Sequence, residues 1–251
     1  VIAAGGAADK VVFSGVGKTQ QEMLSALEHG IRCFNVESES ELLTLAGVAA
    51  TCGKTAPVSM RGNPVVVAGT HPYISTGLRE NKFGVDVETA RRLYQVAHDH
   101  RALEPVAIDC HIGSQILDIA PFLESLDCLL TLIDELAAEG ITLRHIDIGG
   151  GLGVSYQENA PAIEEYMSAL AAKLESRDLE LVLEPGRSIV ALAGALLTRV
   201  LYLKPSDAKN FAVVDAAMND LLRPSLYDAW QDIQAVTPHE GESRQWDLSL
   251  I

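Results

Sequence analysis

The chain has 251 residues, 48% of them apolar, and a formal net charge of −15 at pH 7. This length fits one large barrel or two smaller domains, with enough apolar residues for a sizeable core. The acidic balance argues against a nucleic-acid partner, because phosphate backbones are bound mainly through excess Lys and Arg. No stretch approaches 18 continuous apolar residues, so neither a membrane span nor a membrane partner is expected, and no targeting signal can be read.

Four cysteines occur, at positions 33, 52, 110 and 128, and no two have the C-x-x-C spacing of a metal clip. Cys33 and Cys110 lie inside apolar, strand-like runs. We therefore expect reduced, buried thiols in a cytoplasmic protein, and no metal site.

Short apolar runs that end in Gly or a polar residue predict six β-strands. In chain order they are Val11–Gly15, Cys33–Glu37, Ala56–Arg61, Val106–Ile112, His145–Gly150 and Leu181–Gly186. Amphipathic stretches between them predict helices. The clearest begins after Asp118 and ends at Gly140. Its apolar face comprises Phe122, Leu126, Leu129, Leu130, Ile133 and Leu136.

A second helix is predicted from about Pro161 to Arg177, with Ile163, Met167, Leu170 and Leu174 on one face. Alternating strands and helices imply a parallel sheet with right-handed crossovers, either doubly wound or closed as a barrel. Polar residues and glycines follow all six strands, which favours an α/β fold of the (β/α)8 TIM-barrel type. Six strands do not close an eight-stranded barrel, so two β/α units are expected to be missing before the apolar start at Val1.

After Gly194 the pattern changes to two strand-like runs, Ala195–Leu203 and Phe211–Asp215, without a long helix between them. This predicts a partial barrel over residues 1–193 and part of a β-rich C-terminal domain over residues 194–251. The second part is too short for a substantial core of its own, and its apolar end suggests truncation.

The run Gly15-Val16-Gly17-Lys18-Thr19 suggests a nucleotide loop. A P-loop requires Gly five positions before its Gly-Lys-Thr, and Val12 stands there, so this interpretation fails. A strand-to-helix turn with Thr19 as the N-cap is expected instead.

Two glycine-bearing segments follow late strands. Consecutive glycines at Gly149, Gly150, Gly151 and Gly153 allow backbone N–H groups to converge on an anion, although a flexible turn explains them equally well. Glu184-Pro185-Gly186-Arg187 places a carboxylate at the end of an apolar strand. Such a group needs a cationic partner, which is either a pyridinium nitrogen or Arg187 in a structural ion pair.

In Asp109-Cys110-His111-Ile112-Gly113-Ser114, strand alternation turns Asp109 and His111 toward the barrel mouth. His111 offers a flat ring to stack on a cofactor, and Ser114 can donate to phosphate. A lone histidine is more often a satisfied core residue. A long loop rich in Gly and Pro between Arg61 and Lys82 favours a site or an interface there.

These features together resemble the alanine-racemase-like class of pyridoxal-phosphate enzymes, and within it the diaminopimelate decarboxylases. The matching segments cover essentially the whole chain: SGVGKT (14–19), FNVESESEL (34–42), HPYISTGLRENKFG (71–84), CHIGSQ (110–115), GGGLG (149–153), EPGRSIVA (184–191) and VDAAMNDLLRPSLYDA (214–229). Related ornithine and arginine decarboxylases share the CHIGS-like, GGG and EPGR elements but not the last segment.

The resemblance implies pyridoxal phosphate as the cofactor, decarboxylation of meso-2,6-diaminopimelate to L-lysine and CO2, and a homodimer with its active site at the interface. It implies that Gly149–Gly151, Ser114 and Gly186 hold the phosphate, while His111 stacks on the ring. It also implies that Glu184 pairs with the ring nitrogen and that Arg61 lies near the ring. Substrate contacts are implied for Arg187, Arg223 and Tyr227.

Two features of the resembled family are not found in the chain. Its cofactor lysine belongs upstream of the SGVGKT segment, and none of Lys10, Lys18, Lys54 and Lys82 has the matching context. Its catalytic cysteine belongs after the Trp246-Asp247 region. We therefore expect an inactive chain that binds the cofactor weakly and without a covalent bond. The alternatives are a regulatory pseudoenzyme, or a racemase or decarboxylase acting on another basic amino acid.

Overall fold

The computed structural model describes residues 1–64, 83–237 and 247–249. The chain divides into two compact units. The first comprises Val1–Val154 and Ala160–Ser188, and the second comprises Ser155–Asn159 and Ile189–Ile251. The sequence placed this division a few residues later, after residue 193. Most of the long loop predicted between Arg61 and Lys82, and of the segment 71–84, lies outside the described residues.

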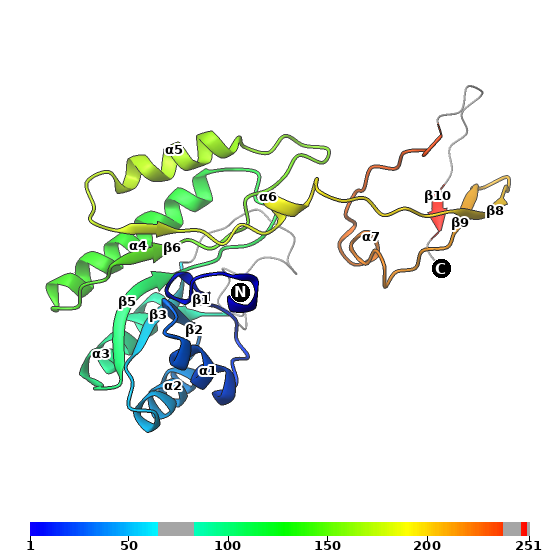
Figure 1. The fold of residues 1–251 in the computed structure, drawn as a ribbon. Coiled ribbons are helices and arrows are strands. Elements are labelled where there is room, and N and C mark those ends of the chain that lie inside the picture. Colours follow the sequence, from blue (N-terminus) through cyan, green and yellow to red (C-terminus); the bar gives the residue numbers. More distant parts are fainter. Residues whose placement is uncertain (65–82, 238–246, 250–251) are drawn as a thin grey trace. The chain divides into compact units, whose positions relative to one another are not determined.

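The first unit is built on a curved, parallel sheet (Figure 1). Its strands follow the order β1 (Val12–Phe13), β2 (Cys33–Val36), β3 (Ala56–Asn63), β5 (Leu103–Asp109), β6 (His145–Asp147) and β7 (Glu180–Val182). A short strand, β4 (Val85–Asp86), pairs with the end of β3. Six parallel strands in chain order, each followed by a helix, confirm the predicted partial (β/α)8 barrel.

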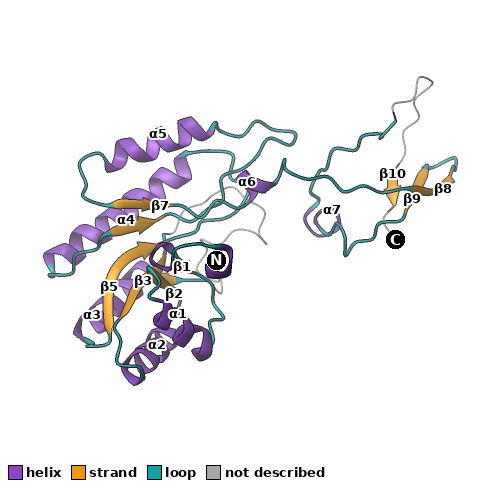
Figure 2. Cartoon of the chain, in the orientation of Figure 1, coloured by secondary structure: helices purple, strands orange, loops and turns teal. Residues whose placement is uncertain are grey.

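Among the described residues, five helices connect the strands and cover the outer face of the sheet (Figure 2). They are α1 (Gln20–His29), α2 (Glu39–Thr51), α3 (Val87–Asp99), α4 (Ala120–Ala138) and α5 (Ile163–Leu174). Two 3-10 turns, Ile2–Ala4 and Ala8–Lys10, precede β1, and the short helix α6 (Arg187–Val190) follows β7. The core lies between sheet and helices. In the described residues no helix is long and apolar enough to cross a membrane.

The helix predictions are confirmed in part. Thr19 is the N-cap of α1 and forms a capping box with Glu22, which pairs otherwise unsatisfied backbone N–H groups. The predicted apolar face of α4 is buried throughout. The predicted face of α5 is wrong in two positions, because Ile163 and Met167 are exposed. The buried face is Tyr166, Leu170 and Leu174, a spacing of four residues that keeps them on one side of the helix.

The register of the strands determines which side chains point to the inner face of the sheet and which point to the helices. Arg61 of β3 pairs with Asp109 of β5, which pairs with Asp147 of β6. These three residues form a lateral row on the inner face of the curved sheet, because paired residues of parallel strands point to the same side. Their neighbours Met60, Ile108 and Ile146 form the corresponding row that packs into the main core.

The strand β5 begins three residues earlier than predicted, at Leu103 instead of Val106. A β-bulge between Val58 and Ser59 interrupts its ladder with β3. The buried hydroxyl of Tyr94 fills the gap by accepting from Met60 N–H (3.1 Å) and donating to Ala107 C=O (2.6 Å). A tyrosine from α3 thus replaces backbone hydrogen bonds that the bulge disrupts.

Side chains connect the beginning and the end of the sheet at both ends of its strands. At the amino-terminal ends, Arg32, which precedes β2, forms an ion pair with Glu180 at the start of β7. At the carboxyl-terminal ends, Ser14, which follows β1, donates from Oγ to Oε1 of Glu184, which follows β7, at 2.5 Å. The sheet therefore curls far enough for its first and last strands to face each other across the barrel interior.

The second unit contains a three-stranded sheet of β8 (Val200–Lys204), β9 (Phe211–Val214) and β10 (Asp247–Ser249). The two predicted strands pair antiparallel, as β8 and β9, and β10 pairs parallel to β9. The helix α7 (Arg223–Tyr227) lies between β9 and β10 in sequence. All five residues of β8 are exposed.

Candidate functional site

The predicted site residues of the first unit gather where the parallel strands end. Arg61 lies on β3, and His111 and Ser114 follow β5. The glycine run follows β6, and Glu184 follows β7. Because all of these strands run in one direction, their carboxyl ends form a single mouth. The fold therefore brings together residues up to 170 positions apart.

Close packing of the loops at this mouth explains why the run consists of glycines. Gly151 C=O accepts from Ile116 N–H (3.0 Å), and Gly153 N–H donates back to Ile116 C=O (2.9 Å). A Cβ on Gly150 would lie 2.2 Å from Glu184 O, and a Cβ on Gly151 would lie 2.2 Å from Gly113 O. Any larger residue would push apart the loops that follow β5, β6 and β7. The glycines thus bring the predicted phosphate contacts close together.

His111 takes part in this loop contact. Its Nδ1 accepts from Gly150 N–H at 3.2 Å, which leaves the ring proton on Nε2. Burial, and to a lesser extent the charge of Arg61, lowers the pKa of His111 to about 4. The imidazole is therefore neutral near pH 7, a state suited to packing against a flat ring.

Glu184 is exposed at the mouth, and its described partner is Ser14. The alternative of a buried ion pair with Arg187 therefore does not fit its surroundings. Arg187 is half-buried and donates to Oε1 of Gln115 at 2.9 Å. Beside them, a Cβ added to Gly186 would find no atom within 4 Å, so space remains open next to its backbone.

Arg61 is almost fully buried and forms an ion pair with Glu37 (Nη1 to Oε1, 3.1 Å). Its guanidinium carbon lies 5.1 Å from the centre of the Phe83 ring. Within the described residues its buried Nε has no hydrogen-bond partner. Arg61 is thus positioned at the mouth by Glu37 and retains one donor for a further group.

Two buried carboxyl groups, Asp109 and Asp147, lie side by side beneath the mouth. Burial, followed by the charge of Asp147, raises the pKa of Asp109 well above its usual range. Burial, followed by the charge of Glu184, raises the pKa of Asp147 to about 7. At least one of the pair therefore holds a proton near neutral pH. The sequence predicts that Asp109 points into the barrel, and Asp147 was not among the predicted site residues. The alternation of side chains in His145-Ile146-Asp147 indicates the same inward direction for Asp147.

Two lysines have structural roles, because their amines already donate to groups within the chain. The Nζ of Lys18, with a side chain only 1% exposed, pairs with Glu41 (2.7 Å) and donates to two backbone carbonyl oxygens. The Nζ of Lys54 donates to the carbonyl oxygens of Leu27 and Glu28 near the end of α1. Neither presents a free amine to the mouth. Lys82 lies outside the described residues.

In the second unit, α7 brings the remaining predicted substrate residues together. The guanidinium carbon of Arg223 lies 5.1 Å from the centre of the Tyr227 ring. Within the described residues the buried Nε of Arg223 has no hydrogen-bond partner. The spacing of four positions places both side chains on one side of the helix.

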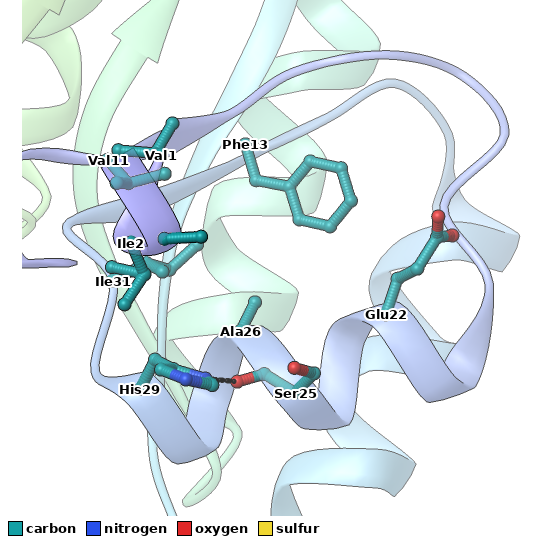
Figure 3. A pocket seen from close by; sticks show the side chains of 10 residues that line it. Val1, Ile2, Val11, Phe13, Glu22, Ser25, Ala26, His29 and Ile31 are labelled. Atoms are coloured by element: carbon teal, nitrogen blue, oxygen red, sulfur yellow. Dashed lines mark hydrogen bonds between the residues drawn. The ribbon is translucent and has the colours of Figure 1, made fainter. Parts of the chain in front are cut away.

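A shallow pocket of about 400 Å3 lies elsewhere, between the N-terminal segment and α1 (Figure 3). Its lining is mainly apolar and includes Val1, Ile2, Phe13 and Ile31. Its polar groups are satisfied locally, since Glu22 belongs to the α1 capping box and His29 contacts the Ser25 carbonyl oxygen. It contains none of the predicted site residues.

One protein-family model matches most of the chain. Residues 1–191 match the model "Pyridoxal-dependent decarboxylase, pyridoxal binding domain". The match includes the glycine run, His111 and Glu184.

The chain belongs to the pyridoxal-dependent decarboxylase family.

Curated relatives refine the comparison. The chain is 57% identical over 249 residues to a diaminopimelate decarboxylase of Pseudomonas aeruginosa, which covers 99% of this chain and 60% of that protein. It is also 57% identical over 250 residues to the Vibrio cholerae enzyme of the same name. That match covers 99% of this chain and 60% of the Vibrio cholerae protein. The chain thus spans about 60% of the length of these relatives.

A solved structure shows the same fold. It is a diaminopimelate decarboxylase from Helicobacter pylori complexed with L-lysine, with a TM-score of 0.91 and 46% sequence identity. The similarity covers 95% of this chain and 60% of that one. The partial barrel described above is therefore an arrangement that relatives of this chain adopt.

Proposed function

We propose that this chain supplies the pyridoxal-phosphate site of a decarboxylase that converts meso-2,6-diaminopimelate to L-lysine and CO2. The observation that carries the proposal is the exposed carboxylate of Glu184 at a mouth that also holds the neutral ring of His111 and the open backbone at Gly186. Family membership and the names of the relatives support the reaction class and substrate.

The residues of the mouth suit the cofactor. Ser114, Gly149–Gly151 and Gly186 are proposed to hold its phosphate, because a Cβ on Gly186 would meet no atom within 4 Å and the backbone there is open to an anion. His111 is proposed to pack on the ring. Among the residues that the structure describes, the buried Nε of Arg61 has no hydrogen-bond partner, and Arg61 is proposed to lie near the ring.

When bound, the cofactor supplies an electron sink for the charge left at Cα as CO2 departs. Glu184 has the complementary role of favouring a protonated ring nitrogen, since a carboxylate stabilises a neighbouring cation. His111 contributes an uncharged face that excludes water from one side of the ring. Removal of the Glu184 charge is therefore expected to impair decarboxylation more than folding.

Arg187, Arg223 and Tyr227 are proposed to bind the distal amino and carboxyl groups of the substrate. Arginine forks match carboxylates in charge and geometry. The family resemblance also supports a cytoplasmic homodimer with its active site at the interface. The four unpaired thiols are compatible with a reducing compartment.

The reaction is tested in a chimera in which these 251 residues replace the matching segment of the Pseudomonas aeruginosa relative. We expect release of CO2 from meso-2,6-diaminopimelate that requires pyridoxal phosphate, and much slower release from ornithine, arginine or lysine. Glu184→Gln in the chimera is expected to abolish most turnover while leaving the unfolding midpoint unchanged. Preference for another amino acid, racemisation alone, or full activity of the variant would overturn the proposal.

The isolated chain offers a second test. Lys18 and Lys54 donate to structural partners, so we expect non-covalent binding of pyridoxal phosphate and no turnover. Borohydride reduction followed by mass spectrometry is expected to leave the chain without a stoichiometric adduct. A stoichiometric adduct on a single lysine would show that the chain carries its own reactive amine.

A further inference from the structure

A chain of three hydrogen bonds crosses the barrel interior and ends on Glu184. Asn35, fully buried on β2, donates from Nδ2 to Asp147 Oδ2 (3.4 Å) and to Ser14 Oγ (2.9 Å). Ser14 in turn donates to Glu184 Oε1 (2.5 Å). The side chains come from four different strand ends, those of β1, β2, β6 and β7.

The direction of these bonds follows from the chemistry of the groups. An amide nitrogen only donates, so Ser14 Oγ must accept from Asn35. The single hydroxyl proton of Ser14 is then directed to Glu184, which must accept it. Cys33 fixes the orientation of the Asn35 amide, because its thiol donates from Sγ to Asn35 Oδ1 at 3.8 Å. The Ser14 hydroxyl therefore cannot reverse without losing the bond from Asn35.

Asp147 lies at the other end of this series of hydrogen bonds. Its Oδ1 accepts from Gly149 N–H at 2.9 Å, and its Oδ2 accepts from Asn35. The position of Asn35 is thereby tied to the glycine run. One oxygen of Glu184 is occupied by Ser14, and the exposed side chain directs the carboxylate to the open mouth.

We propose that Ser14 and Asn35 are positioning residues for Glu184, which hold its carboxylate as a hydrogen-bond acceptor in one orientation at the mouth. This inference rests on the proposed function, in which Glu184 meets the cofactor ring nitrogen. An exposed glutamate otherwise samples several rotamers, and fixing it lowers the entropy lost on binding. Neither residue is assigned a catalytic role.

Several charged and titratable groups surround Asp147. The carboxylate of Glu184 is one of the groups that raise the pKa of Asp147, after burial. The other charged groups near Asp147 are Asp109 and Arg61, and Arg61 is itself paired with Glu37.

The test uses the 251-residue chain and pyridoxine 5′-phosphate labelled with 15N in its ring. This probe has no aldehyde, so its binding requires no lysine. The 15N chemical shift reports the protonation of the ring nitrogen as the pH is raised. In the wild-type chain the bound ring is expected to keep its proton to a higher pH than the free probe.

Ser14→Ala is expected to lower the proton affinity of the bound ring nitrogen by about tenfold, one pKa unit, because a carboxylate released from Ser14 faces the ring in only some of its rotamers. Ser14→Thr keeps the hydroxyl and is expected to retain the wild-type value. Asn35→Leu, similar in shape, is expected to give a smaller loss because Ser14 keeps its hydroxyl. Ser125→Ala removes a buried hydroxyl on α4 that has no hydrogen-bond partner in the described residues, and serves as the matched control.

Glu184→Gln separates the two hypotheses. If Glu184→Gln lowers the proton affinity of the ring nitrogen but Ser14→Ala leaves it unchanged or raises it, the positioning role is refuted and the role of Glu184 stands. If Glu184→Gln has no effect, the proposed role of Glu184 fails, and the positioning role fails with it. Thermal unfolding of each variant confirms that the loss arises in a folded chain.

Discussion

Arg187 donates from its guanidinium to Oε1 of Gln115 at 2.9 Å, across 72 positions of sequence. The same Gln115 side chain donates from Nε2 to Val154 C=O (2.7 Å) and accepts from Val154 N–H (3.2 Å). It thus connects the loop after β5, the end of the glycine run and the start of α6. Gln115 does so with a φ of 58°, in the left-handed region that residues other than glycine seldom adopt.

Substitutions of Gln115 are expected to separate backbone strain from hydrogen bonding. Gln115→Ala loses the three side-chain bonds but keeps the unfavourable φ, so the free energy of unfolding should fall by about 2 kcal/mol. Gln115→Gly loses the same bonds and relieves the strain, and should be at least as stable as the alanine variant. Urea unfolding checks this order, and an alanine variant clearly more stable than the glycine variant would contradict it.

Tyr94→Phe removes the hydroxyl that bridges the bulge between β3 and β5. Met60 N–H and Ala107 C=O would then be buried without this partner, at a cost of about 2–4 kcal/mol in the free energy of unfolding. Tyr202, which is 72% exposed on β8, provides the control, because Tyr202→Phe should change stability little. Equal effects of the two substitutions would show that the bridge does not stabilise the sheet.

Lys18→Met breaks a buried ion pair and leaves Glu41 without its cationic partner. We expect a loss of about 3–5 kcal/mol in the free energy of unfolding. The double variant Lys18→Met, Glu41→Met should recover much of this loss, since no uncompensated charge then remains. If ATP raised the unfolding temperature of the wild-type chain, and Lys18→Met removed that effect, the structural role of Lys18 would be contradicted.

Asp147 is expected to make stability decrease as the pH rises. Its folded-state pKa is raised to about 7, whereas the unfolded chain has the ordinary value near 3.8. Between these values the folded state binds more protons, so the free energy of unfolding falls with increasing pH.

Asp147→Asn should therefore be less destabilising at pH 7.5 than at pH 4.5. Taking the difference between variant and wild type cancels the opposite contribution of His111 and His145, whose pKa values are lowered. Urea unfolding measured across this range checks the sign. A difference that grows with pH would show that Asp147 is ionised in the folded chain.

Local sequence patterns determined much of the first unit. Short apolar runs that end in Gly or a polar residue located the strands, and the apolar face of α4 follows directly from helical spacing. The N-cap at Thr19 was equally readable, because a capping box depends on residues only three positions apart. On α5 the same reasoning failed at Ile163 and Met167, because the position of a helix against its sheet decides which side is covered.

The sequence by itself thus determined the order of strands and helices, the chemistry at the strand ends, and the presence of Glu184, His111 and the glycine run. Only the tertiary structure decided their partners. The bonds from Asn35 to Ser14 and from Ser14 to Glu184 depend on the curl of the sheet. That curl is set by packing over the whole barrel, so no local spacing encodes which strand ends will meet.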